Sequence, residues 1–206
     1  MIEFPDPKQA DPDGLLAIGG NLAPETLLAA YRKGIFPWYA EEQPILWWAP
    51  DPRMVLFPAD FHASRRLRRR LTQACFRFSW DKAFDDVIRI CATIPRRGQD
   101  GTWILPEMLE AYRELHRLGH AHSVEVWRGE ELIGGLYGVL QDKVFFAESM
   151  FSRKPDGSKM ALAKLVERAL AEGWRLIDCQ FHTEHLASLG AHTISRRQFM
   201  ELLEKP

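Results

Sequence analysis

The amino-acid sequence predicts an α+β fold in two parts. After residue 58, apolar residues recur at helical spacing in three segments, and three extended runs separated by short turns follow, the pattern of an antiparallel meander. A helix, an apolar strand and short helices complete this part. The first 57 residues are instead rich in proline, glycine and tryptophan. We therefore expect a small amino-terminal domain over residues 1–57 and a larger domain over 58–206.

The predicted elements follow from periodicity and from their end signals. The amino-terminal part predicts one helix over 24–33, between a Gly-Gly-Asn turn and a glycine. The aromatic stretch after it is interrupted by prolines, which favours short extended pieces over helix. The larger part predicts, in order, helices over 64–71, 82–92 and 106–118, strands over 122–127, 131–140 and 143–151, a helix over 158–171, a strand over 175–180 and short helices over 184–189 and 197–203.

Length and composition exclude several classes of protein. With 206 residues, 46% of them hydrophobic, the chain can bury one good core. No run approaches the roughly 20 apolar residues of a membrane span, and the acidic, proline-containing first residues do not have the order of a secretory signal. Cys75, Cys91 and Cys179 are too widely spaced for a disulfide framework or a thiolate metal site. We therefore expect a cytoplasmic protein without membrane attachment.

The net charge of -1 hides an uneven distribution. Residues 1–50 sum to about -4, residues 51–99 to about +6 and the remainder to about -3. Five arginines fall in the predicted helix over 64–71, where one face carries Arg65, Arg68 and Arg69. Such a face is usually only solvated, but further arginines without local acidic partners stand nearby, so phosphate binding is favoured here. These are Arg77, Arg96 and Arg97.

Polar residues stand in two otherwise apolar strands. Alternation places Asp178 and Gln180 on one face of the strand over 175–180, and Glu148 stands among aromatic residues in the strand over 143–151. Buried polar groups need partners. Asp178 and Gln180 are therefore either a satisfied structural pair or a reaction site. Glu148 either faces water from an edge strand, pairs with an arginine or binds a cationic substrate.

Tryptophan is the third signal, with seven in the chain. Four of them stand in proline or glycine contexts rather than on helix faces: Trp38, Trp47, Trp48 and Trp103. Loop tryptophans either fill the gap between two layers or stack on a ligand, and stacking on a nucleobase contributes roughly 1 to 3 kcal/mol per base.

The sequence predicts neither a metal nor a phosphate-binding loop. His120 with His122, and His182 with His185, have spacings that ligands sometimes use, but no third ligand supports either pair. The segment SRKPDGSK, before the helix over 158–171, lacks the Gly-Lys-Ser/Thr order of a P-loop.

Several long strings resemble the bacterial leucyl/phenylalanyl-tRNA-protein transferase family, and the similarity covers nearly the whole chain. The strings are GLLAIGGNL (14–22), GIFPW (34–38), PILWWAPDPR (44–53), GTWI (101–104), LGHAHSVEVW (118–127), GGLYGV (134–139), ESMFS (148–152), LIDCQ (176–180) and HLASLGA (185–191). Asn21 and Ala147 depart from the family pattern, which usually has Asp and Gly there. We expect neither to touch a reacting group.

The resemblance implies an acetyltransferase-like catalytic domain with a small amino-terminal domain packed on it. It also implies that Leu or Phe, and less readily Met, passes from aminoacyl-tRNA to proteins beginning with Arg or Lys, which marks them for proteolysis. An aminoacyl ester is already activated, so no cofactor, ATP or metal is expected. The acceptor needs a neutral α-amine, whose pKa near 8 leaves a usable fraction at neutral pH. We expect a monomer.

For this reaction, we hypothesise that Asp178 and Gln180 are the catalytic residues. The side-chain carbonyl of Gln180 is expected to accept a hydrogen bond from the attacking amine, while Asp178 orients that amide. Trp38 and Trp103 match the positions that hold the terminal adenosine.

The remaining expected roles concern binding. Glu148, with Ser149 beside it, is expected to attract the cationic amine or side chain of the acceptor, and Arg65, Arg68 and Arg69 to contact tRNA phosphates. Five apolar residues would line the aminoacyl pocket: Leu136, Phe145, Met150, Leu165 and Ile177.

Two other functions fit parts of the sequence. A small-molecule acetyltransferase using an acyl thioester would need a glycine-rich loop before the helix over 158–171, where only Gly157 stands. A non-catalytic RNA-binding module would use the arginine face and the tryptophans, but it would give Asp178 and Gln180 no purpose.

Overall fold

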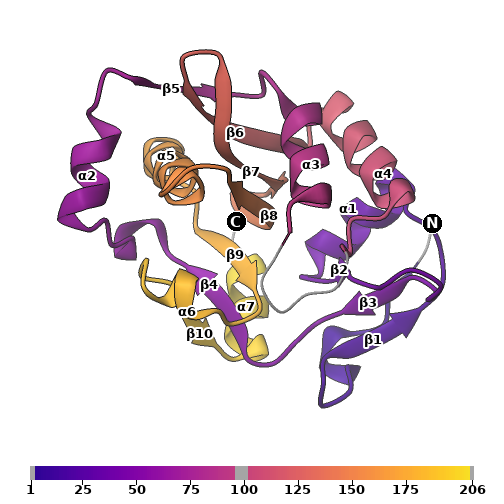
Figure 1. The fold of residues 1–206 in the computed structure, drawn as a ribbon. Helices are drawn as coiled ribbons and strands as arrows, with labels where there is room; N and C mark the ends of the chain where they lie inside the picture. The colour runs from indigo at the N-terminus through magenta and orange to yellow at the C-terminus, as the bar shows by residue number, and fades with distance from the viewer. Residues whose placement is uncertain (1–2, 96–101, 205–206) are drawn as a thin grey trace.

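The computed structural model describes residues 3–95 and 102–204, in which a seven-stranded sheet lies beside a smaller three-stranded one (Figure 1). The large sheet has the strand order β10-β4-β9-β8-β7-β6-β5, and the small one β1-β3-β2. The strands are β1 Leu15–Ile18, β2 Phe36–Pro37, β3 Leu46–Trp48, β4 Arg53–Leu56, β5 Phe76–Trp80, β6 Ala121–Arg128, β7 Glu131–Gln141, β8 Val144–Ser152, β9 Leu176–Gln180 and β10 His192–Ile194. The helices are α1 Pro24–Arg32, α2 Arg65–Leu71, α3 Phe84–Thr93, α4 Pro106–Arg117, α5 Gly157–Glu172, α6 Glu184–Ala187 and α7 Arg196–Leu203.

The α+β class expected from the sequence is confirmed. The predicted meander is present, because β6, β7 and β8 pair antiparallel in sequence order. Each predicted helix also occurs, with ends that differ by at most a few residues. The sequence did not predict the strands β1, β4, β5 and β10. All four are short, and their pairing partners lie far away along the chain, as for β4 with β9.

Helices cover both faces of the large sheet and divide its core in two (Figure 1). One hydrophobic cluster joins α1, α3, α4 and α7 to one face, and the other joins α2 and α5 to the opposite face. Strand β7 contributes to both, since Tyr137 belongs to the first cluster and Leu136 to the second. No helix in the described part of the chain is long and apolar enough to cross a membrane.

The expected division at residue 57 stays a prediction. Strand β4, just before it, is hydrogen-bonded to β9 and β10 of the large sheet. The first hydrophobic cluster also contains Leu27 and Tyr31 from the first part together with Tyr112 and Phe199 from the second. The two parts therefore share one continuous core.

Glu125 of β6 ties the end of β5 to the start of α3. Its side chain is fully buried and accepts hydrogen bonds from the hydroxyls of Ser79 and Ser123, each at 2.5 Å. It also accepts from the backbone N–H groups of Lys82 and Ala83, both at 3.4 Å, and Ala83 is the residue before α3, which has no side-chain cap of its own. The carboxylate, which belongs to a neighbouring strand, thus caps the amino-terminal end of α3.

We expect Glu125→Ala to lower the free energy of unfolding by about 2 to 3 kcal/mol, because it leaves buried hydroxyl and amide donors without acceptors. Urea denaturation measures the change. Glu110→Ala is the matched control: Glu110 is an exposed glutamate of α4 that pairs with Arg113, and its loss should change stability by less than about 0.5 kcal/mol. Equal effects of the two substitutions would contradict the capping role.

Candidate functional site

A cavity of about 320 Å³ opens where two parallel strands of the large sheet separate. Strands β8 and β9 pair only over Val144–Phe146 and Leu176–Asp178. The residues directly after these pairs, 147–150 on β8 and 179–180 on β9, line the cavity. Six of the expected site residues line it: Trp103, Leu136, Glu148, Ser149, Met150 and Gln180. The divergence of the strands therefore brings an expected amide, an expected carboxyl and an expected tryptophan to one cavity.

Two β-bulges aim side chains into this cavity. Tyr137 pairs with Ser149 and Gly138 with Ala147, so Glu148 is the extra residue of β8. In the same way Cys179 is the extra residue of β9 opposite β4. Bulges re-aim side chains and are frequent beside active sites. Gly138 is required at this point, because a Cβ there would lie 2.1 Å from the carbonyl oxygen of Phe146.

The bulge in β9 also corrects one expectation from strand alternation. Asp178 and Gln180 were expected to share a face, yet Gln180 lines the cavity together with Cys179, while Asp178 is fully buried and does not line it. The backbone of Gln180 has a φ of 62°, in the left-handed region, which ends the regular alternation of the strand. Simple alternation cannot anticipate a bulge followed by a left-handed residue.

Glu148 holds the side chain of Gln180. The Nε2 group of Gln180 donates to Oε1 of Glu148 at 3.1 Å. The hydroxyl of Tyr31 donates to Oε1 at 2.7 Å, and that of Tyr112 donates to Oε2 at 3.0 Å. Glu148 is 7% exposed and both tyrosines are fully buried. Of the alternatives left open for Glu148, an exposed edge-strand residue is therefore wrong, because the carboxyl is buried in a polar network.

Burial raises the pKa of Glu148 to about 7, and the hydrogen bonds from Tyr31 and Tyr112 limit the rise. The pKa values of Tyr31 and Tyr112 are themselves raised well above the usual value, first by burial and then by the charge of Glu148. Both phenols therefore keep their protons at neutral pH, whereas Glu148 can hold or release one.

Asp178 lies behind the cavity in an ion pair with Arg53. Its two oxygens accept from Nε of Arg53 at 2.8 Å and from Nη2 at 2.6 Å, and both side chains are buried. The guanidinium is held between the rings of Phe36 and Phe199, at 4.6 and 4.7 Å from their centroids. Oδ1 of Asp178 also accepts the backbone N–H of Gln180 at 3.0 Å.

This geometry changes how Asp178 acts on Gln180. Asp178 was expected to orient the side-chain amide, but it holds the backbone of Gln180, and Glu148 holds the amide. Arg53, which was not among the residues expected from the sequence, completes this support. Its position at the end of the string PILWWAPDPR was a signal, but only the structure shows which carboxylate it meets.

The two expected adenosine-stacking tryptophans lie in different positions. Trp103 lines the cavity. Trp38 does not line it, but its ring centroid lies 5.3 Å from that of Phe181, the residue after Gln180. The indole of Trp38 is 37% exposed, so one of its surfaces is open to solvent.

Of the five expected aminoacyl-pocket residues, Leu136 and Met150 line the cavity. Phe145, Leu165 and Ile177 do not, because they belong to the buried core beneath it. The apolar wall also includes Leu162 and Leu186, which were not expected from the sequence. Leu162 lies one turn before Leu165 on α5. The expected helix therefore does line the cavity, but with a residue one turn nearer its amino-terminal end.

Three further lining residues bear on the chemistry. Ala147, which was expected to stay clear of any reacting group, lines the cavity and adds a methyl group to its wall. Burial raises the pKa of the Cys179 thiol far above its usual value, so this cysteine is not a thiolate nucleophile. Burial and the nearby charge of Lys159 lower the pKa of His185, which favours its neutral form.

The expected tRNA-binding arginines form an exposed face of α2. Arg65, Arg68 and Arg69 are exposed, and none forms an ion pair with another described residue. Their neighbours Arg66 and Arg70 instead pair with Asp156 at 3.1 and 3.4 Å. Arg77 stacks on Trp127, and Arg96 and Arg97 lie outside the described residues.

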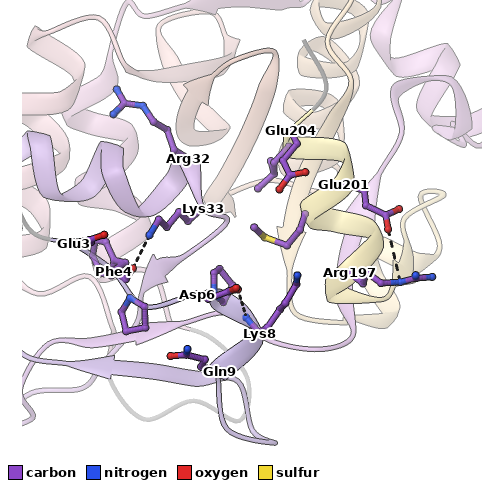
Figure 2. Close-up of a pocket in the computed structure, with 14 residues that line it drawn as sticks. Glu3, Phe4, Asp6, Lys8, Gln9, Arg32, Lys33, Arg197, Glu201 and Glu204 are labelled. Carbon is purple, nitrogen blue, oxygen red and sulfur yellow. Dashed lines mark hydrogen bonds and ion pairs between the residues drawn. The ribbon is translucent and has the colours of Figure 1, made fainter.

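A second, larger cavity of about 910 Å³ contains none of the expected site residues. It lies between the amino-terminal segment, the end of α1 and helix α7 (Figure 2). Its charged side chains are of both signs, and two of them are engaged within the lining: Lys33 donates to the carbonyl of Phe4, and Arg197 pairs with Glu201 (Figure 2). Size alone therefore does not identify the reaction site. No group of three or more potential metal ligands occurs among residues 3–95 and 102–204.

Comparison with known proteins matches two consecutive family models to this chain. Residues 55–204 match "Leucyl/phenylalanyl-tRNA protein transferase", and residues 20–51 match the amino-terminal domain of the same family. The chain belongs to the leucyl/phenylalanyl-tRNA-protein transferase family. A transferase of this name from an Anaeromyxobacter species is 56% identical over 98% of this chain and 86% of its own length. One from Syntrophobacter fumaroxidans is 58% identical over 97% of this chain and 86% of its own length.

Membership of the leucyl/phenylalanyl-tRNA-protein transferase family makes the protein an aminoacyltransferase that uses aminoacyl-tRNA and acts on proteins. Among solved structures, a GCN5-related N-acetyltransferase from Kribbella flavida has a TM-score of 0.45 and 11% sequence identity, over 84% of this chain and 61% of that one.

Proposed function

We propose that the protein transfers Leu or Phe, and less readily Met, from aminoacyl-tRNA to the α-amine of proteins that begin with Arg or Lys. This would mark them for degradation, and we propose that it takes place in the cytoplasm with a monomeric enzyme and no cofactor. The supporting observation is one cavity in which an apolar wall, an aromatic ring and a fixed amide meet: Leu136 and Met150, Trp103, and Gln180.

The donor would lie across this cavity with its ends held separately. The terminal adenosine would stack on Trp103 and on the exposed surface of Trp38. The aminoacyl side chain would enter the apolar wall formed by Leu136, Met150 and Leu162. A hydrophobic pocket separates side chains by only about 1 to 3 kcal/mol per methylene group, so the shape of the wall against β-branched side chains must add to the selectivity.

Gln180 would position the acceptor amine. Its Nε2 group is engaged with Glu148, so its carbonyl oxygen is the part of the amide left to accept a hydrogen bond from the attacking nitrogen. Asp178 and Arg53 support this placement by fixing the backbone of Gln180. An amide is too weak a base to remove the proton, so positioning is its contribution.

Glu148, with Ser149 beside it, would meet the acceptor at its α-amine. The carboxyl of Glu148 is buried and hydrogen-bonded, which suits a small ammonium or amine group better than a bulky guanidinium. Direct attack of this amine on the ester is favoured over a cysteine-bound intermediate, because the Cys179 thiol stays protonated.

The exposed arginine face of α2 would bind tRNA phosphates. Each phosphate contact makes log affinity fall with log salt concentration by roughly 0.7 to 0.9. We expect the triple substitution of Arg65, Arg68 and Arg69 by alanine to reduce this slope by about 2, measured by filter binding of charged tRNA between low and moderate salt. Substituting Arg197 and Lys8, at the second cavity, provides a charge-loss control that should leave the slope unchanged. An unchanged slope in the triple variant would exclude the α2 face from tRNA binding.

Transfer of labelled Leu from charged tRNA to a peptide beginning with Arg tests the function directly. The wild-type protein should modify this peptide and not one beginning with Ala, and acetyl-coenzyme A should neither compete nor serve as donor. Gln180→Ala should lower the rate by at least about 10²-fold with an unchanged KM for tRNA. A folded wild-type protein that transfers no amino acid from any charged tRNA would overturn the proposal.

A further inference from the structure

Four buried oxygens from three side chains form a closed ring behind the cavity. The Tyr31 hydroxyl lies 2.7 Å from Oε1 of Glu148 and 2.5 Å from the Tyr112 hydroxyl, which lies 3.0 Å from Oε2 of Glu148. The three side chains come from α1, from α4 and from the bulge of β8. Three elements that are distant in sequence are thus joined by one ring, and Oε1 of Glu148 connects this ring to Gln180.

The number of protons in this ring depends on the state of Glu148. Three oxygen–oxygen contacts require three protons, and two phenols supply two. When Glu148 is ionised, one contact of the ring lacks a proton. When Glu148 is protonated, the ring is complete, and the hydrogen bonds can run in either direction because each carboxyl oxygen faces one tyrosine. The ring is therefore arranged to receive one proton.

No cation in the described part of the chain neutralises Glu148 directly. The titratable groups that face it are Tyr31 of α1, Tyr112 of α4 and Asp178 of β9. The negative charge of Asp178 favours the protonated form of Glu148, although Arg53 compensates much of that charge. Burial acts in the same direction and brings the pKa of Glu148 to about 7. A base of this strength is suited to proton transfer near neutral pH.

We propose that Glu148 is the proton acceptor of the transfer reaction, and that Tyr31 and Tyr112 are positioning residues that hold its carboxyl in place and stabilise the ionised form that accepts the proton. This inference rests on the proposed function. The amine nitrogen attacks the ester carbonyl carbon, and the C–N bond forms while one N–H proton passes to Glu148. The bond between that carbon and the ribose oxygen then breaks. Glu148 returns the proton to the departing oxygen and is again a carboxylate.

Gln180 keeps its orientation through both states of Glu148. Oε1 of Glu148 can accept from Nε2 of Gln180 whether the proton of the ring lies on Oε2 or is absent. The carbonyl of Gln180 then continues to hold the amine. This separates two tasks that an amide cannot combine, since Gln180 positions the amine and Glu148 removes its proton.

Glu148→Gln is a close mimic of the protonated state. The introduced amide can donate to Tyr112 and accept from Tyr31, so the ring stays complete and the fold should be retained. We expect kcat/KM for transfer to fall about 10² to 10⁴-fold. In the wild-type protein, kcat/KM should increase with pH through about 7 as Glu148 ionises, and this increase should be absent in Glu148→Gln. Only the increase caused by titration of the acceptor amine should remain. Repeating the profile with acceptors whose amines differ in basicity separates that second titration.

A measurement without turnover checks the same group. In the wild-type protein, the contribution of Glu148 to stability should fall as the pH rises from about 4.5 to about 7, because the unfolded carboxyl is ionised in this range while folded Glu148 keeps its proton. In Glu148→Gln, this part of the pH dependence should be absent. Urea midpoints across this range, compared between the two proteins, isolate the contribution of Glu148.

Tyr112→Phe tests the ring. Removing this donor weakens the stabilisation of the carboxylate, so the rise of kcat/KM with pH should move to higher pH while the rate at high pH largely recovers. Tyr39→Phe is the matched control, since the Tyr39 hydroxyl donates at 3.2 Å to a different carboxylate, that of Glu107. It should leave the position of the rise unchanged.

The outcomes separate the two proposals. A wild-type protein that fails to transfer any amino acid removes the proposed function and this inference with it. A wild-type protein that transfers normally, together with Glu148→Gln within about three-fold of its rate at the optimal pH, overturns the inference alone. An identical pH profile for wild type and Tyr112→Phe would exclude the tyrosines from the proton-accepting role.

Discussion

Asp178→Ala is expected to lower the free energy of unfolding by about 3 to 5 kcal/mol and to reduce transfer strongly. The substitution leaves the guanidinium of Arg53 buried at 1% exposure without its carboxylate, and an uncompensated buried charge is among the most destabilising changes. It also removes the acceptor for the backbone N–H of Gln180. Chemical denaturation measures the first effect and the peptide transfer assay the second.

The double substitution Arg53→Met with Asp178→Leu distinguishes folding from positioning. Replacing both members of a buried pair by apolar residues of similar size is often neutral or stabilising, so most of the lost stability should return. Transfer should stay low, because Gln180 has still lost the acceptor for its N–H group. If the double variant recovered both stability and activity, Asp178 would have only a structural role.

Trp103→Ala is expected to raise KM for aminoacyl-tRNA by about 5 to 150-fold, which corresponds to the roughly 1 to 3 kcal/mol of one stacked base. Trp103 lines the cavity beside Glu148 and Gln180. The increase in KM should therefore appear with full-length aminoacyl-tRNA and also with a minimal aminoacyl-adenosine donor. Steady-state kinetics with both donors make the measurement.

Two variants control for the loss of a large side chain. Trp103→Phe keeps an aromatic face and should retain most of the affinity. Trp127→Ala removes a tryptophan that instead packs near Arg77 and hydrogen-bonds to Ser79, so it should leave KM for the donor unchanged. Equal increases in KM for Trp103→Ala and Trp127→Ala would contradict adenosine stacking at residue 103.

The parts of the fold with strong local periodicity were predictable from the sequence. The meander of β6, β7 and β8 consists of long extended runs separated by short turns, and helices α3, α4 and α5 keep helical spacing over ten or more residues. Strand β4 has only four residues, all buried, and its partners β9 and β10 are more than a hundred residues away. Local sequence carries little information about such pairing.

The same distinction applies to the site. Glu148 and Gln180 were identifiable as polar residues in apolar strands, and the cavity contains both. The direction of their side chains was not predictable, because the bulges at Glu148 and Cys179 interrupt the alternation of the strands. The partners of Glu148 were not predicted for another reason. Tyr31 and Tyr112 have the spacing of ordinary core-facing residues in two helices, and nothing in the sequence indicates that their hydroxyls meet.

The two aromatic neighbours of Arg53 come from segments far apart along the chain. Phe36 belongs to β2, and Phe199 belongs to helix α7. Without α7 the guanidinium would lack one of these rings, and the ion pair with Asp178 would be open to water on that side. The support of the Gln180 backbone therefore depends on a helix that contributes no residue to the cavity wall.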